Sequence, residues 1–174
     1  MKKAFSLIEL MIVIVIIGVV YTLAISKLQS VGQEKMQVSL SNLKEYLHTY
    51  LKEDATSAKL LCLDACESCS VYVDGVRQED EVKNFLDASV EVYRYDFTQG
   101  AVRKKEEVFF DEEGREQSVC FAFSVNKDMI SDQDIVVYKE KSYDYTPYFG
   151  NTKVYNHLEE LLDDKTQLQQ EVMQ

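Results

Sequence analysis

The chain has 174 residues, of which 46% are hydrophobic and 11% aromatic, and its 30 acidic and 19 basic side chains give a net charge of −11. This length suits one domain with an appendage, and the aromatic content argues against a disordered chain. The excess of acidic residues argues against a generic binder of DNA or anionic lipid, since both are densely negative, so we expect no direct nucleic-acid binding.

The apolar segment at residues 5–25 contains Glu9 as its one side chain charged at neutral pH. As a helix rising about 1.5 Å per residue it matches a hydrocarbon core of about 30 Å, and a helix satisfies its own backbone groups in lipid. Lys2 and Lys3 predict a cytoplasmic N-terminus and an extracytoplasmic or periplasmic domain over residues 26–174. The segment is too long for a signal peptide and no A-x-A-like site follows, so we expect a retained, single-pass inner-membrane anchor.

Glu9 needs a physical explanation, because a carboxylate within a membrane helix costs about 2.5–3.5 kcal/mol on an insertion scale. In one interpretation it lies near enough to the helix start to reach the lipid headgroups, where this cost fades. In the other it pairs with a cation of another molecule, since residues 5–25 contain no Lys, Arg or His. Two opposite charges attract strongly in such a medium, and each is costly there alone.

Residues 2–11 have the sequence KKAFSLIELM. This run resembles the class III signal of type IV pilins and type II secretion pseudopilins, through its basic leader, Phe5, Glu9 four residues later and the apolar helix. The resemblance implies that a prepilin peptidase removes residues 1–4 by cutting between Ala4 and Phe5, and then methylates the new amine of Phe5. It also implies that Glu9 pairs with the N-terminal amine of a neighbouring subunit during filament assembly. The family usually has glycine before the cut, where this chain has Ala4.

Helical periodicity continues beyond Ser26. Spacings of four and three residues define one apolar stripe, made of Met36, Leu40, Leu43, Leu47 and Tyr50. Leu51 widens the stripe, whereas five charged residues lie mainly off it: Lys35, Lys44, Glu45, Lys52 and Glu53. We therefore expect one long helix from Phe5 to about Asp54, with a transmembrane half and an amphipathic half.

Most of the remaining chain predicts strands. Residues 56–70 are expected to be irregular, and residues 79–88 to form one or two helical turns. Short β-rich segments bounded by turn residues then follow, at residues 90–97, 107–110, 119–125 and 135–138. Their short loops favour antiparallel neighbours.

A C-terminal helix is predicted where Asn156 and Glu159 form a capping pair before a series of leucines. The polar tail at residues 167–174 is expected to fray. Together the elements predict an α+β, pilin-like fold, in which the long N-terminal helix packs on an antiparallel β-sheet. Residues 108–115 (VFFDEEGR) are faintly similar to a strand–turn–strand segment of H-type minor pseudopilins.

The cysteines are the main cluster of reactive side chains: Cys62, Cys66, Cys69 and Cys120. The predicted orientation places them outside the cytoplasm, where disulfides persist, and the three complete pairings stay open. We expect Cys120, in a strand, to tie down residues 56–70 through one of the others. A four-cysteine zinc site is the first alternative, disfavoured by its distant fourth ligand. A redox role for Cys66-Glu67-Ser68-Cys69 is the second, disfavoured because no βαβ pattern surrounds it.

Other polar groups are interpreted as surface residues. His48 and His157 are far apart and show no ligand or triad spacing. The basic run at residues 103–105 is followed at once by two glutamates, so we interpret it as a charged turn rather than a DNA contact. Six acidic residues offer calcium ligands but lack the pattern of a calcium loop: Asp111, Glu112, Glu113, Asp128, Asp132 and Asp134. With no phosphate loop or nucleophile elbow, we expect no enzyme, no cofactor and no metal site.

These features predict a non-enzymatic pseudopilin or minor pilin that assembles into a short envelope filament for type II protein secretion. Its expected partners are a prepilin peptidase, other pilin or pseudopilin subunits contacted through the N-terminal helix, and the inner membrane. One alternative is a minor pilin of a type IV pilus or of a DNA-uptake (competence) system. Another is a membrane-anchored binding or sensory domain that never polymerises, which predicts an uncut N-terminus and no effect of Glu9→Ala on assembly.

Overall fold

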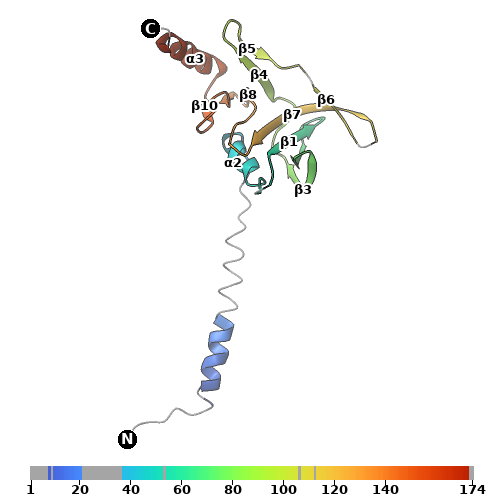
Figure 1. The fold of residues 1–174 in the computed structure, drawn as a ribbon, viewed down its shortest axis with the longest axis vertical. Helices are drawn as coiled ribbons and strands as arrows, with labels where there is room; N and C mark the ends of the chain where they lie inside the picture. Colours follow the sequence, from blue (N-terminus) through green and yellow to red (C-terminus); the bar gives the residue numbers. More distant parts are fainter. Residues whose placement is uncertain are drawn as a thin grey trace. The chain divides into compact units, whose positions relative to one another are not determined.

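The computed structural model of the chain describes residues 8, 10–20, 37–52, 54–105, 107–111 and 113–172. The chain divides into two units, Met1–Gln37 and Val38–Gln174. In the first unit, residues 8 and 10–20 are helical, within the segment predicted as a helix (Figure 1). Residues 21–36, the middle of the predicted long helix, lie outside the described residues.

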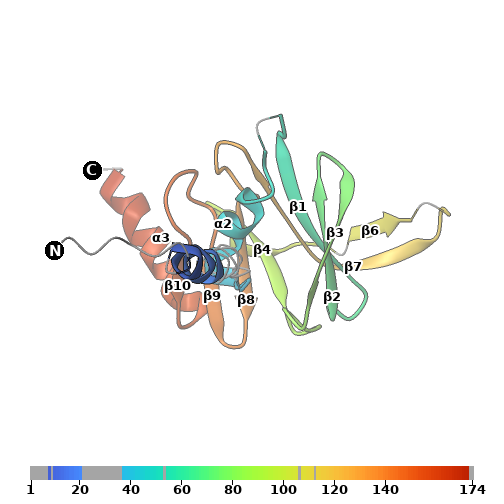
Figure 2. The same ribbon diagram turned by 90° about the horizontal axis from the view of Figure 1, so that it is seen from below.

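The second unit contains two antiparallel sheets (Figure 2), where the sequence predicted one. The first sheet has the order β3-β2-β1-β7-β6, with β3 at Val76–Lys83, β2 at Ser68–Val73, β1 at Ser57–Leu63, β7 at Glu116–Asn126 and β6 at Glu107–Phe110. The second has the order β10-β9-β8-β4-β5, with β10 at Lys153–Tyr155, β9 at Lys141–Asp144, β8 at Asp134–Tyr138, β4 at Glu91–Asp96 and β5 at Gly100–Arg103. The α+β class is as predicted, and the arrangement is compatible with a pilin-like fold.

A short helix packs against the first sheet. It begins as a 3₁₀ turn, η1 (Leu40–Asn42), continues as α2 (Leu43–His48), and contacts β1 and β7. The continuous helix predicted from Phe5 to about Asp54 is wrong here, because residues 37–39 are not helical, Ser39 is extended at φ −144°, and α2 ends at His48. Thr49 closes it, because its hydroxyl donates to the Tyr46 carbonyl at 2.7 Å and the next amides form short i→i−3 bonds.

The core joins this helix to both sheets. Leu40, Leu43 and Leu47 of the predicted stripe are at most 4% exposed, which confirms that part of the prediction. The buried cluster also holds Phe123 from β7 and Tyr145 just after β9, whose ring centroids are 4.5 Å apart. The Tyr145 hydroxyl donates to the Leu40 carbonyl, so the second sheet is fixed to the start of the helix.

Two predictions between residues 56 and 88 are wrong. Residues 56–70 contain β1 and the start of β2, and residues 76–83 form β3 rather than helical turns. Asp74 and Gly75 have φ of 48° and 83° and form the two-residue turn between β2 and β3. Such turns require positive φ at both positions, and an Asp-Gly pair adopts them at little cost. The turn therefore places the acidic residues that follow it in β3, paired with β2.

The strands predicted after residue 88 and the C-terminal helix are confirmed, whereas β5, β9 and β10 were not predicted. The four predicted strands correspond to β4, β6, β7 and β8, and the C-terminal helix α3 spans Leu158–Val172. At its start, Glu160 rather than Glu159 accepts from the backbone and side-chain nitrogens of Asn156, at 3.0 and 3.3 Å. Helix α3 contacts β9 and β10, and its residues 167–172 are helical, although the polar tail was expected to fray.

Candidate functional site

The helix at residues 10–20 has no polar face. Apart from Gly18, every described residue from Ile8 to Val20 is Ile, Leu, Met or Val, and all are exposed within the single chain. The exposed fraction of these side chains lies between 46% at Val13 and 67% at Ile8. A helix that is apolar on all sides normally lies in lipid or inside a bundle of other helices. We therefore expect lipid or other helices to cover this apolar surface.

The three residues of the expected processing and assembly chemistry are Ala4, Phe5 and Glu9, and they lie outside the described residues. No described helix is both long enough and apolar enough to cross a membrane.

The four cysteines form two disulfides. Cys62 and Cys69 face each other across β1 and β2 and are bonded, with their Cα atoms 4.1 Å apart. Cys66, in the turn between these strands, is bonded to Cys120 of β7, with the Cα atoms 5.6 Å apart. The second bond agrees with the expectation that Cys120 ties down the 56–70 segment. The two bonds join three neighbouring strands of the first sheet.

This disulfide pairing argues against both alternatives for the cysteines, the zinc site and the redox motif. All four sulfurs are in disulfides, so none is a thiolate for zinc. Cys66 and Cys69 are bonded to different partners, whereas a redox Cys-x-x-Cys motif cycles through a bond between its own two cysteines.

Asp111 and Asp132, two of the acidic residues interpreted as surface groups rather than calcium ligands, are engaged in local contacts. Asp111 accepts from the backbone amides of Glu113 and Arg115, at 3.0 and 2.8 Å, and so closes the β6–β7 hairpin. Asp132 accepts from the amide and hydroxyl of Ser124, both at 2.8 Å. Glu112 lies outside the described residues. In the described part of the chain no group of three or more His, Cys, Asp or Glu side chains is arranged to hold a metal ion.

The basic run at residues 103–105 pairs with acids of its own domain. Arg103 contacts Glu91 at 3.0 Å, and Lys104 contacts the nearly buried Asp134 at 2.9 Å. Burial acts to lower the pKa of Lys104, but the hydrogen bond and charge of Asp134 outweigh it and hold the pKa above its usual value. These contacts agree with the charged-turn interpretation. His48 approaches the Lys127 carbonyl at 3.4 Å and His157 is exposed, so the structure does not bring the two histidines into one site.

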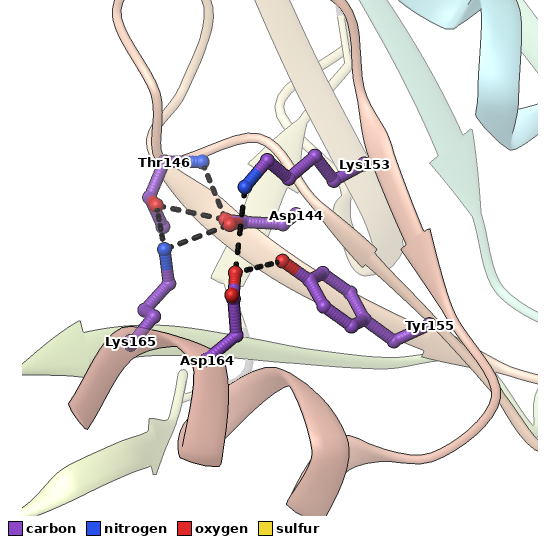
Figure 3. Close-up of polar contacts among 6 residues, drawn as sticks. All are labelled: Asp144, Thr146, Lys153, Tyr155, Asp164 and Lys165. Carbon is purple, nitrogen blue, oxygen red and sulfur yellow. Dashed lines mark hydrogen bonds and ion pairs between the residues drawn. The ribbon is translucent and has the colours of Figure 1, made fainter. Parts of the chain in front are cut away.

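A polar cluster that the sequence did not predict attaches α3 to the second sheet (Figure 3). The amine of Lys165 contacts Asp144 at 2.7 Å and the Thr146 hydroxyl at 2.6 Å. Asp144 also accepts from the amide and hydroxyl of Thr146. A second group lies beside it, where Asp164 accepts from Tyr155 at 2.5 Å and from Lys153 at 3.4 Å. The hydrogen bond from the Tyr155 hydroxyl is the main cause that lowers the pKa of Asp164.

Lys44 was interpreted as lying mainly off the buried stripe, and this is wrong, because it is only 2% exposed. Its amine approaches the Gly150 carbonyl at 3.5 Å, which is a weak contact. Burial lowers the pKa of Lys44, while the charges of Glu45 and Asp144 oppose the shift. Helical spacing alone could not find this burial, because Asp144 and Gly150, which act on the Lys44 amine, are remote from it in sequence.

The comparisons with known proteins identify the N-terminal segment alone. Residues 1–25 match the family model described as the prokaryotic N-terminal methylation motif. No curated protein and no solved structure matches the chain. The matched residues include Ala4, Phe5 and Glu9 and all of the described apolar helix. The chain therefore carries a type IV pilin-like class III signal, which indicates a substrate of a prepilin peptidase.

Proposed function

We propose that the chain is a pseudopilin or minor pilin subunit that serves type II protein secretion as part of a short envelope filament. The observation that carries this proposal is the methylation motif at residues 1–25, which coincides with a helix that is apolar on every side. In the proposed pathway a prepilin peptidase cuts between Ala4 and Phe5 and methylates the amine of Phe5. The domain that follows residues 5–25 lies outside the cytoplasm.

Assembly is the proposed activity. The apolar helix first holds the subunit in the inner membrane, because lipid covers its exposed Ile and Val side chains. In the filament, helices of neighbouring subunits cover the same surface. The Glu9 carboxylate pairs with the methylated amine of a neighbour, since each charge alone is costly in an apolar medium. The apolar surface of the helix is thus covered by lipid before assembly and by other helices after it. The ion pair sets the register between subunits.

The features of the second unit support an extracytoplasmic location. Its two disulfides, Cys62–Cys69 and Cys66–Cys120, are of a kind that persists in oxidising compartments and is rare in the cytosol. Its acidic character favours a protein partner over direct contact with DNA. This last point favours secretion over DNA uptake as the process that the filament serves.

The decisive experiment measures the intact mass and N-terminal sequence of the chain from membranes that contain an active prepilin peptidase. We expect a chain that starts at a methylated Phe5. A matched variant, Ala4→Gly, restores the residue usual at this position, and it should be processed at least as completely. An intact Met1 start in both forms, with the peptidase active on another substrate, would contradict the proposal and favour a non-polymerising anchored domain.

A further inference from the structure

The second unit has a groove between its second sheet and α3. The groove has a volume of about 880 Å³ and is bordered by β4, residues 131–134, residues 146–148 and the last turns of α3. Its apolar walls are formed by Tyr95, Phe97, Tyr148, Leu168 and Val172. Phe97, Tyr148 and Val172 are 76%, 58% and 87% exposed. Large apolar side chains gathered at one opening are typical of a binding surface.

The polar cluster of Figure 3 holds one wall of this groove in place. Lys165 projects from α3 and is only 11% exposed at its side chain, while its partner Asp144 is 2% exposed. The same amine lies 5.4 Å from the centroid of the Tyr95 ring on β4. Because these contacts fix α3 against the sheet, the groove exists before any partner binds, which lowers the entropic cost of binding.

Among the described residues that line the groove, one cationic side chain has no carboxylate beside it. Lys165 is paired with Asp144, and Lys104 lies among Asp134, Glu107 and Asp132. Arg94 of β4 is exposed, and its guanidinium makes no hydrogen bond or ion pair with a described residue. A guanidinium presents a fork of donors that fits a carboxylate.

A buried hydroxyl adds a second unsatisfied group. Ser131 lines the groove and is 8% exposed, and its hydroxyl has no hydrogen-bond partner among the described residues. The oxygen itself is buried, so an occupant of the groove does not reach it, and the polar contact offered to an occupant is that of Arg94.

The exposure of the groove walls indicates whether a small molecule or a protein segment binds there. A small-molecule site buries about 70–90% of its ligand, and walls as exposed as Phe97 and Val172 do not enclose a ligand in this way. A protein segment brings its own surface to cover them. We propose that this groove binds a segment of a partner protein that presents apolar side chains together with one carboxylate, with Arg94 as the carboxylate contact.

The test selects peptides on the full chain in detergent micelles, held through an N-terminal tag. A random hexapeptide library is the probe, and we expect enriched peptides that combine apolar residues with Asp or Glu. One enriched peptide and its analogue with the neutral amide in place of the carboxylate are then compared by fluorescence anisotropy. Arg94→Gln and the neutral analogue should each weaken binding about five-fold, and together little more than either alone. Leu168→Ser should weaken binding about ten-fold.

The matched control is Arg77→Gln, which removes an exposed arginine from β3 of the other sheet and should leave the affinity unchanged. Thermal unfolding of each variant verifies that it folds. The proposal is overturned if no peptide is enriched, if Arg94→Gln and Leu168→Ser leave the affinity unchanged, or if the acidic peptide and its neutral analogue bind equally. Binding is measured on the unprocessed chain, so its outcome is independent of cleavage at Ala4 and of the proposed function.

Discussion

Lys44 illustrates how a single charged residue can conflict with the pattern around it. Helical spacing sets it beside the buried Leu43 and Leu47, but its own side chain is covered as well. The protein thus keeps an amine in a site where burial lowers its pKa and the one hydrogen bond that it makes to a described residue is long. Replacing a poorly paired buried ion by an apolar side chain of similar volume is often stabilising.

We therefore expect Lys44→Met to raise the free energy of unfolding at pH 7 by about 1 kcal/mol, measured by urea denaturation. The folded pKa of Lys44 lies below the usual value of 10.5, so between these two values the unfolded chain binds more protons than the folded one. The contribution of Lys44 to stability thus becomes more favourable as pH rises through this window. The advantage of Lys44→Met should shrink toward pH 10.5 and be constant at lower pH.

Lys59→Met is the control for this measurement, because Lys59 is an exposed lysine of β1. Its effect should stay within about 0.5 kcal/mol at any pH in the range. A loss of stability in Lys44→Met at pH 7 would show instead that the amine contributes a favourable contact.

At the scale of elements, a largely buried ion pair helps to hold the α3 helix on the second sheet. Asp144 and Lys165 are 2% and 11% exposed, so removing either charge leaves the other without an opposite charge beside it, with only the polar groups of Thr146 as close partners. Asp144→Asn should cost about 3–5 kcal/mol in the free energy of unfolding, and adding Lys165→Met should recover much of this loss. The exposed pair of Lys153 and Asp164 supplies the contrast, because Lys153→Met should cost at most about 1 kcal/mol. Equal losses at the two pairs would contradict this account.

The two disulfides differ in the loops that they close. Cys66 and Cys120 are separated by 54 residues, and Cys62 and Cys69 by 7. In the chain-entropy account, replacing the first pair by alanine should cost about 4 kcal/mol and replacing the second about 2–3 kcal/mol. Urea unfolding in oxidising buffer measures both losses. If the Cys66–Cys120 variant were as stable as the native chain, the structural role of this bond would be refuted.

Particular elements explain which parts of this fold the sequence could predict. Residues 121–125 alternate between buried and half-buried positions, so this strand can be recognised from its local sequence pattern alone. The β3 strand has the sequence VRQEDEVK, which by composition resembles a surface helix. Its pairing is set by the Asp74-Gly75 turn, a signal that was present in the sequence and was missed.

The polar contacts of the site were beyond sequence reasoning for a different reason. Asp144 and Lys165 lie on separate elements, and neither residue type nor spacing joins them. Likewise, the groove beside Tyr95 exists only once β4 and α3 are placed together. The N-terminal signal could be predicted because its leader, Phe5, Glu9 and apolar run are contiguous in the chain.

At the scale of the whole molecule, the proposed filament function and the folding of the second unit depend on different residues. The residues assigned to processing and assembly lie in the first unit, whereas the core and both disulfides lie in the second. A change in the signal should therefore alter assembly without altering the stability of the domain. A simple anchored domain predicts no effect on either property.

Glu9→Gln tests this separation, because it removes the charge while keeping the size of the side chain. We expect the variant to start at a methylated Phe5, to unfold at the same urea concentration as the native chain, and to lose the high-mass species that formaldehyde forms in intact cells. The reason is that a neighbour's amine would face an uncharged amide in an apolar medium, and leaving one member of such a pair alone costs about 3–5 kcal/mol. Glu171→Gln, which changes an exposed glutamate near the end of α3, is the matched control and should keep these species. Native amounts of crosslinked subunits in Glu9→Gln would mean that assembly does not depend on this ion pair, and that Glu9 instead reaches the lipid headgroups.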